Sequence, residues 1–219
     1  MISPESFYEK NLKGKSELEI MVVICSLGRE IESLKCDIEC SNYATRTWCI
    51  DPEEIAQIDM MREYFERAIM AYEEVVGEYI PSAEEQKWID FNVNIPYIEK
   101  LVFSIGGHFG GYKTKTYTVD GDKIHVDVEY SASCNLLALY ETNPKEISKE
   151  DFFNAFKDLH IGEWYEEYNN NRDGVFVLDG TEWDLEIYFS NGHTPVKIHG
   201  SNAYPYNFVH LLELLGMER

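Results

Sequence analysis

The sequence lacks the short motifs by which common enzyme classes are recognised. It contains no HExxH zinc motif, no GxSxG nucleophile turn, and no GxxxxGKS or GxxxxGKT phosphate loop. It therefore indicates no reaction class and no cofactor. A catalytic site would have to be assembled from residues that lie far apart in the chain.

Long apolar runs and basic residues are also scarce. No window approaches the roughly twenty apolar residues of a membrane helix, and the first residues lack the pattern of a secretory signal. Only 19 Lys and Arg stand against 40 Asp and Glu, for a net charge of −21. Since an acidic surface repels nucleic acids and anionic lipids, we expect a cytoplasmic protein that binds neither directly.

The five cysteines have no regular spacing. They include no CxxC pair, which argues against a disulfide framework and fits a reducing compartment. Cys36 and Cys40 stand one helical turn apart and could share a zinc ion with Cys49. The simpler interpretation is that they are free, partly buried thiols.

What the sequence does contain is helical periodicity in its first ninety residues. Ser16 and Glu19 form a capping-box pattern before one apolar stripe, and Asp51-Pro52 begins a second. Residues 82–91 form a shorter third helix. We therefore predict a helical region over residues 1–95 that contains an N-terminal helical hairpin.

From residue 96 the apolar period changes to two, the signature of strands. Residues 101–105, 112–119 and 124–130 read as an antiparallel meander in which Asp120-Gly121 forms a tight turn. Residues 175–178 read as a further short strand.

Near the C-terminus, residues 183–189 and 196–199 form a hairpin around Asn191-Gly192. Helices follow Ser148 and Pro205. The predicted fold class is therefore α+β: an antiparallel sheet, made of a meander and a C-terminal hairpin, flanked by helices. The α+β domain covers residues 96–219, and the helical region packs on it in one compact unit.

Four glycines crowd residues 106–111, between two predicted strands. A phosphate loop leads from a strand into a helix, so the segment is better explained as a bulge or tight bend where another backbone comes close. His108 and Phe109 then lie on an exposed tip or beneath the helical region. We retain both as candidate binding residues.

Ionisable residues on one strand suggest a second kind of site. His125, Asp127 and Glu129 share a strand face and could bind a metal, although alternation alone places polar residues on a solvent face. A hydrolase-type enzyme, with a site assembled from distant His, Asp and Glu residues, remains the alternative to a binding protein. A pocket that combines His125 or His160 with Glu163 or Asp127 would favour it.

Two family resemblances follow from the glycine-rich bend at 103–111 and the segment 183–215. Together these segments resemble a family of uncharacterised, hypothetical bacterial proteins, and this likeness implies no activity. From about residue 98 onward the chain is also similar to the emfourin inhibitors of thermolysin-like proteases. That family has a strand that reaches a Gly-Gly-aromatic-x-Gly bend, a central helix, a hairpin and a leucine-rich helix. Here His108 occupies the aromatic position and the connection at 132–146 is longer, so no functional residues are carried over.

The functional hypothesis is a non-enzymatic protein-binding or regulatory protein. Tyrosine-rich polar surfaces are typical of protein contacts. Residues 200–206 also have a purely structural interpretation, in which Ser201 and Asn202 bond to the local backbone. A second alternative is an acidic mimic of nucleic acid, with its carboxylates in rows, and a homo-oligomer is compatible with the sequence. The candidate contact residues are Tyr188, Ser201, Asn202, Tyr204 and Tyr206.

Overall fold

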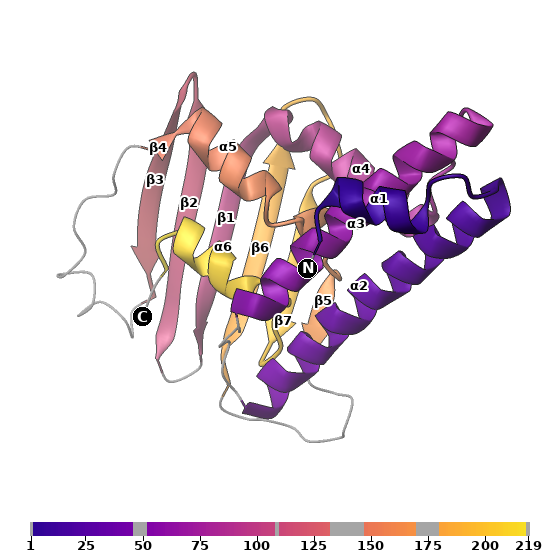
Figure 1. The fold of residues 1–219 in the computed structure, drawn as a ribbon. Helices are drawn as coiled ribbons and strands as arrows, with labels where there is room; N and C mark the ends of the chain where they lie inside the picture. The colour runs from indigo at the N-terminus through magenta and orange to yellow at the C-terminus, as the bar shows by residue number, and fades with distance from the viewer. Residues whose placement is uncertain (1, 46–51, 108–109, 132–146, 170–179, 218–219) are drawn as a thin grey trace. The chain divides into compact units, whose positions relative to one another are not determined.

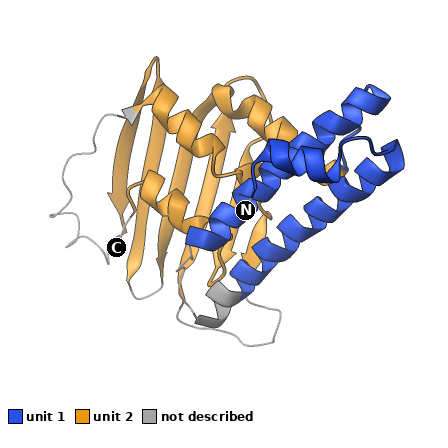
Figure 2. Cartoon of the chain, viewed as in Figure 1, with its two compact units in different colours: residues 1–82 blue, residues 83–219 orange. Residues whose placement is uncertain are grey.

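The computed structural model describes residues 2–45, 52–107, 110–131, 147–169 and 180–217. The chain divides into two compact units, residues 1–82 and 83–219 (Figure 2). Residues 83–95 belong to the second unit, whereas the sequence pattern places them with the N-terminal helices.

The first unit is helical. It consists of α1 (Pro4–Asn11), α2 (Glu17–Thr45) and α3 (Pro52–Val76) (Figure 1). The long helices α2 and α3 bury apolar stripes and form the predicted helical hairpin; Ile24, Ile58 and Ala68 are almost fully buried. Gly77, with a φ of +104°, follows the last residue of α3, as expected of a helix stop.

The second unit is built around a seven-stranded sheet. In chain order, its strands are β1 (Ile98–Gly107), β2 (Gly111–Asp120), β3 (Lys123–Tyr130), β4 (Ile147–Ser148), β5 (Glu167–Asn169), β6 (Glu182–Phe189) and β7 (Val196–Ser201). Their spatial order is β4-β3-β2-β1-β6-β7-β5. Every pairing is antiparallel except that of β5 with β7, so the sheet is mixed.

Helices cover one face of this sheet (Figure 1). They are α4 (Ala83–Asn94), α5 (Lys149–Lys157) and α6 (Phe208–Leu214), with 3-10 turns η1 (Ile95–Tyr97) and η4 (Ile161–Glu163). Aromatic side chains join the layers: Phe208 of α6 lies 4.8 Å from Trp183 and Phe152 of α5 lies 5.6 Å from Tyr117, measured between ring centroids. The α+β prediction, with its meander, hairpin and flanking helices, is confirmed.

The glycine-rich bend is a place of close backbone approach, as predicted. A Cβ atom on Gly106 would lie 2.2 Å from the carbonyl oxygen of Gly111, and one on Gly107 would lie 2.8 Å from that of Gly180. No side chain larger than hydrogen fits at either position without a backbone shift.

Both predicted hairpin turns differ from the structure. In the β2–β3 ladder Asp120 pairs with Lys123, so the two turn residues are Gly121 and Asp122 and not Asp120 and Gly121. The second hairpin closes through residues 190–195 and not through a two-residue turn at Asn191-Gly192. Tertiary contacts hold this longer loop, because Ser190 N–H donates to the carbonyl of Tyr97 at 2.8 Å and the Asn191 amide bonds Asn94 at 2.6 Å.

Three further elements depart from the sequence prediction. The strand expected at 175–178 lies outside the described residues. β4 and β5 were not predicted because, at two and three residues, they are too short to show alternation. Helix α2 continues as far as Thr45.

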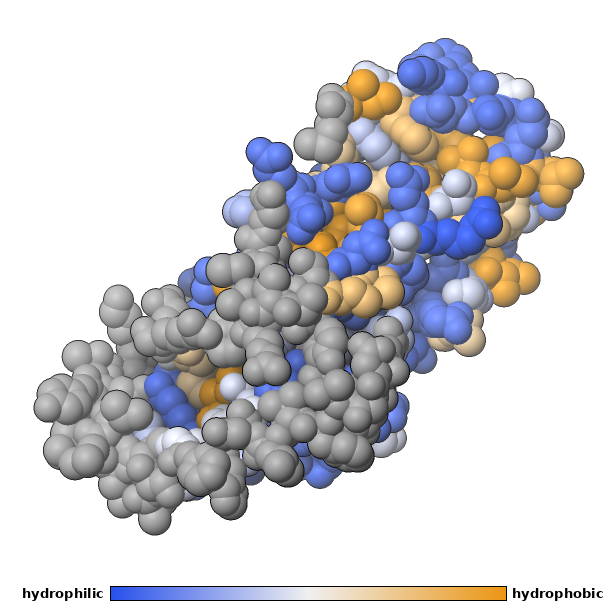
Figure 3. Space-filling view, turned by 90° about the horizontal axis from the view of Figure 1, so that it is seen from below, coloured by the Kyte–Doolittle hydropathy of each residue, from blue (hydrophilic) through white to orange (hydrophobic). Residues whose placement is uncertain are grey.

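Large apolar side chains remain exposed in both units, among them Leu18, Ile80, Val93 and Tyr165. Seen from below, hydrophobic residues alternate with hydrophilic ones on the surface (Figure 3). Among the described helices, none combines the length and apolar character required to span a membrane.

Candidate functional site

The sheet face opposite the helices is polar, and we call it the open face. The register of the strands defines it, because alternate residues point to opposite sides. Leu101, Phe103 and Leu185 point to the helices and are buried. The open face carries Lys100, Val102 and Ser104 of β1, Thr114, Thr116 and Thr118 of β2, His125, Asp127 and Glu129 of β3, Glu182, Asp184, Glu186 and Tyr188 of β6, and Lys197, His199 and Ser201 of β7.

Three acids of β6 form a row on this face, and each has a partner. Asp184 Oδ1 lies 2.8 Å from His199 Nδ1, and Lys197 Nζ donates to Glu186 Oε1 at 3.1 Å. The Tyr112 hydroxyl donates to Glu182. Each carboxylate of this row therefore has a polar partner within the sheet, and Lys197 also offsets the charge of Glu186.

Tyr188 completes a network at the end of the row. Its hydroxyl donates to Glu186, which lowers the pKa of the Glu186 carboxyl and raises the pKa of the Tyr188 phenol. The ammonium groups of Lys100 and Lys197 lie 5.5 and 5.9 Å from the centre of the Tyr188 ring. The ring is half-buried, and these contacts favour its observed orientation.

The acids of β3 differ from those of β6. Asp127 and Glu129 are exposed, and neither forms an ion pair with a residue that the structure describes. Between them and the β6 row lie the small, half-buried side chains of Val102, Ser104 and Thr114. The open face is therefore a surface with small side chains at its centre and unpaired carboxylates along its β3 side.

The predicted contact residues fall into different environments. Tyr188 and Ser201 belong to the open face. Asn202 has a structural role, because its Oδ1 accepts from the Thr181 N–H at 2.9 Å while its own φ is +53°. His108 and Phe109 lie outside the described residues.

Tyr204 and Tyr206 cannot form a contact surface, and that prediction is wrong. They are only 5% and 1% exposed. The Tyr204 ring packs 5.0 Å from the ring of Phe208 in α6, measured between centroids. Their burial contributes to the hydrophobic core and not to recognition.

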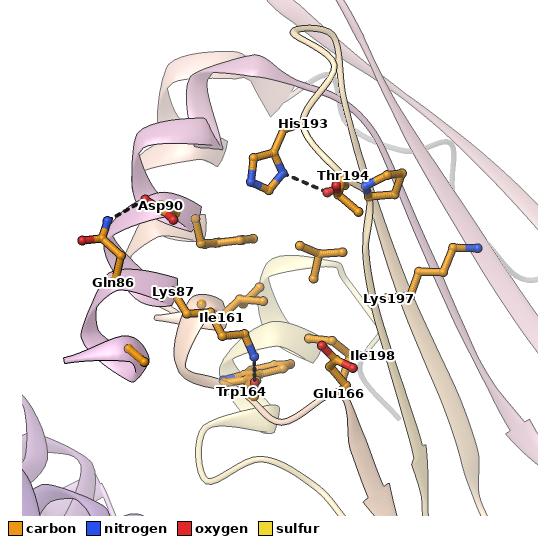
Figure 4. Close-up of a pocket in the computed structure, with 15 residues that line it drawn as sticks. Gln86, Lys87, Asp90, Ile161, Trp164, Glu166, His193, Thr194, Lys197 and Ile198 are labelled. Atoms are coloured by element: carbon orange, nitrogen blue, oxygen red, sulfur yellow. Dashed lines mark hydrogen bonds between the residues drawn. The ribbon is translucent and has the colours of Figure 1, made fainter. Parts of the chain in front are cut away.

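A pocket of about 660 Å³ lies between α4, η4 and β7 (Figure 4). Its floor is apolar and is formed by Phe91, Ile161, Trp164 and Ile198, all of them buried. We call it the β7 pocket. The rest of its lining is Ala83, Gln86, Lys87, Asp90, Gly162, Glu166, His193, Thr194, Pro195, Val196 and Lys197.

The polar groups of the β7 pocket are held by their own surroundings. Lys87 Nζ donates to the carbonyl of Trp164 at 3.1 Å, and His193 Nδ1 lies 2.8 Å from the Thr194 carbonyl. Gln86 donates to Asp90 at 2.7 Å. Among these lining residues, all of which the structure describes, no hydrogen bond joins two ionisable side chains, so no nucleophile and base are paired there.

The enzyme alternative named His125, His160, Glu163 and Asp127, and none of these lines the β7 pocket. His160 Nδ1 lies 3.9 Å from Glu163 Oε1 elsewhere in the unit. Within the described residues, no cluster of three His, Cys, Asp or Glu could hold a metal ion. The Sγ atoms of Cys36 and Cys40 are 3.9 Å apart, both thiols are exposed where partial burial was expected, and Cys49 lies outside the described residues.

Sequence reasoning missed the β7 pocket because its lining comes from separate segments with no shared pattern. The open face had a usable signal in the alternating Thr114, Thr116 and Thr118. Comparison of the chain with protein-family models, curated proteins and solved structures finds no match.

Proposed function

We propose that this is a non-enzymatic binding protein and that the open face of its second unit receives a basic segment of a partner protein. The observation that carries the proposal is the pair of exposed, unpaired carboxylates, Asp127 and Glu129, beside the small side chains of the open face. Lysine and arginine side chains of a partner complement the charge of these two carboxylates.

The composition of the whole chain supports the same partner chemistry. A net charge of −21 attracts a basic protein over long range and repels nucleic acid. The rigid network around Tyr188 supplies an aromatic group whose orientation is already set, which lowers the entropy cost of binding.

The mimicry alternative receives less support. It requires a row of free acids, yet Asp184 and Glu186 of the β6 row are paired with His199 and Lys197. The enzyme alternative has no paired acid and base in the β7 pocket.

The test is the double variant Asp127→Asn/Glu129→Gln. A partner is first captured from a lysate of the source organism, identified by mass spectrometry and purified. Its affinity for the parent protein and for the variant is then measured by titration calorimetry at two salt concentrations. We expect the variant to bind about tenfold more weakly and to lose part of the salt dependence.

Glu63→Gln/Glu66→Gln is the matched control. It removes the same charge from exposed positions of α3 in the first unit, and we expect it to retain the parental affinity. Equal loss in both double variants would mean that only total charge matters. That result would overturn the proposal. So would the absence of a stoichiometric partner, or a partner that binds the Asp127→Asn/Glu129→Gln variant with the parental affinity.

A further inference from the structure

One edge of β7 is only partly covered. On one side β7 pairs with β6 from Val196 to Ser201, but on the other side β5 pairs only with His199, Gly200 and Ser201. The N–H of His199 donates to the carbonyl of Glu166 at 3.0 Å. Beyond that bond, β5 no longer follows β7.

The backbone of Lys197 is left free by this arrangement. Backbone groups two residues apart in a strand point to the same edge, so the N–H and C=O of Lys197 face the same side as those of His199. No backbone group among the described residues bonds them there. Two residues earlier stands Pro195, which has no N–H to leave unpaired.

The β7 pocket lies directly beside this free edge. Val196 and Ile198 line it from β7, Phe91 lines it from α4, and Trp164 forms part of its floor. A strand added to the edge would direct alternate side chains to the helix side of the sheet, into the pocket. The Lys197 side chain does not obstruct the pocket, because it points away from the pocket (Figure 4) and donates a hydrogen bond to Glu186.

The charges at the rim of the pocket complement a basic ligand. Asp90 and Glu166 stand on opposite walls, and neither forms an ion pair with any described residue. The two lysines of the lining are already engaged, Lys87 with the Trp164 carbonyl and Lys197 with Glu186. The remaining charge at the rim is therefore negative.

We propose that the β7 pocket binds an extended segment of another protein by strand addition. The segment bonds the free N–H and C=O of Lys197, inserts an apolar side chain between α4 and β7, and places Lys or Arg beside Asp90 and Glu166. This site is distinct from the open face, and each proposal stands without the other.

The test begins with a random dodecapeptide library displayed on phage and selected on the full chain. The enriched peptides are synthesised, and their affinity is measured by fluorescence anisotropy. We expect a consensus with an apolar residue next to Lys or Arg. Hydrogen exchange should show that the bound peptide protects the Lys197 amide.

Two matched pairs of variants identify the mode of binding. Lys197→Pro removes the outward N–H, whereas Lys197→Thr removes the same side chain and keeps that N–H. Ala83→Phe places a ring in the pocket, whereas Glu84→Phe places one at a neighbouring position outside its lining. We expect Lys197→Pro and Ala83→Phe to weaken binding roughly tenfold and their partners to stay within about twofold.

Several results would overturn this proposal. The first is a selection that enriches no peptide. The second is a set of peptides that bind Lys197→Pro and Ala83→Phe as tightly as they bind the parent. The third is a loss of affinity in Lys197→Thr equal to that in Lys197→Pro. A concentration-dependent dimer that Ala83→Phe abolishes would show that a second copy of the chain occupies the pocket. Ala83 is exposed at the start of α4, so Ala83→Phe stays informative even if Lys197→Pro unfolds.

Discussion

Gly200 should be essential for the stability of the second unit. It lies opposite Trp183 in the β6–β7 ladder, and the indole ring covers it. A Cβ atom at Gly200 would lie 2.0 Å from Trp183 Nε1 and 2.1 Å from Cε2. The substitution Gly200→Ala must therefore displace the ring or separate the strands.

The ring has no free space into which it can move. Trp183 is 0% exposed, and its ring lies 4.8 Å from Phe208, 5.8 Å from Tyr168 and 6.3 Å from Trp164. Its Nε1–H also donates to the carbonyl of Ala203 at 2.9 Å, a bond that displacement would break.

The expected cost follows from these two losses. Overpacking a core costs about 1–3 kcal/mol, and loss of a hydrogen bond adds about 1 kcal/mol. The lower entropy of the unfolded alanine chain offsets roughly 0.4–1 kcal/mol. We therefore expect Gly200→Ala to lower the free energy of unfolding by roughly 1–3.5 kcal/mol.

Urea denaturation followed by tryptophan fluorescence measures this change. In a Trp48→Phe background the remaining tryptophans, Trp88, Trp164 and Trp183, all belong to the second unit, so the signal reports that unit alone. Gly110→Ala is the control, because a Cβ there meets no atom within 4 Å. If Gly200→Ala changes the free energy of unfolding no more than this control does, the packing argument is wrong.

Two further predictions concern other contacts of the second unit. Asn207 is buried, accepts from Trp164 Nε1 at 3.1 Å and donates to the Leu159 carbonyl at 2.8 Å. Asn207→Ala leaves both groups unpaired and should cost about 2–4 kcal/mol in the same denaturation assay; a cost below about 1 kcal/mol would contradict this. Tyr188→Phe removes the bond that lowers the Glu186 pKa, so a carbon NMR titration should find that pKa raised toward its usual value of 4.5. Because the pKa of Glu186 is lowered in the folded protein, this carboxylate stabilises the fold above its unfolded-state pKa, and the stabilisation is lost as the pH falls through its folded-state pKa. The free energy of unfolding should therefore fall less in Tyr188→Phe than in the parent over this acidic range. An unchanged Glu186 pKa in the variant would refute the assignment.

Much of the fold could be predicted because its signals are local. The period-two pattern of residues 101–105 and 183–189 identified β1 and β6, and Asp51-Pro52 marked the beginning of α3. The turn between β6 and β7 was misjudged. Its length depends on bonds from Ser190 and Asn191 to the distant Tyr97 and Asn94, which no local pattern reveals.

The candidate sites were much less predictable. Tyr188 and Tyr204 were both predicted to contact a partner, yet one faces the open side of the sheet and the other is buried against Phe208 of α6. The β7 pocket joins residues that are more than a hundred positions apart in the chain, such as Lys87 and Lys197.

By itself, therefore, the sequence determined the α+β class, the meander, the helical hairpin and the acidic surface, because periodicity, turn residues and charge act over a few neighbouring residues. Tertiary structure alone decided which tyrosines are buried, which carboxylates stay unpaired and where β5 leaves the edge of β7 free. Each of these depends on the packing of segments that are distant in the chain, and local patterns do not specify that packing.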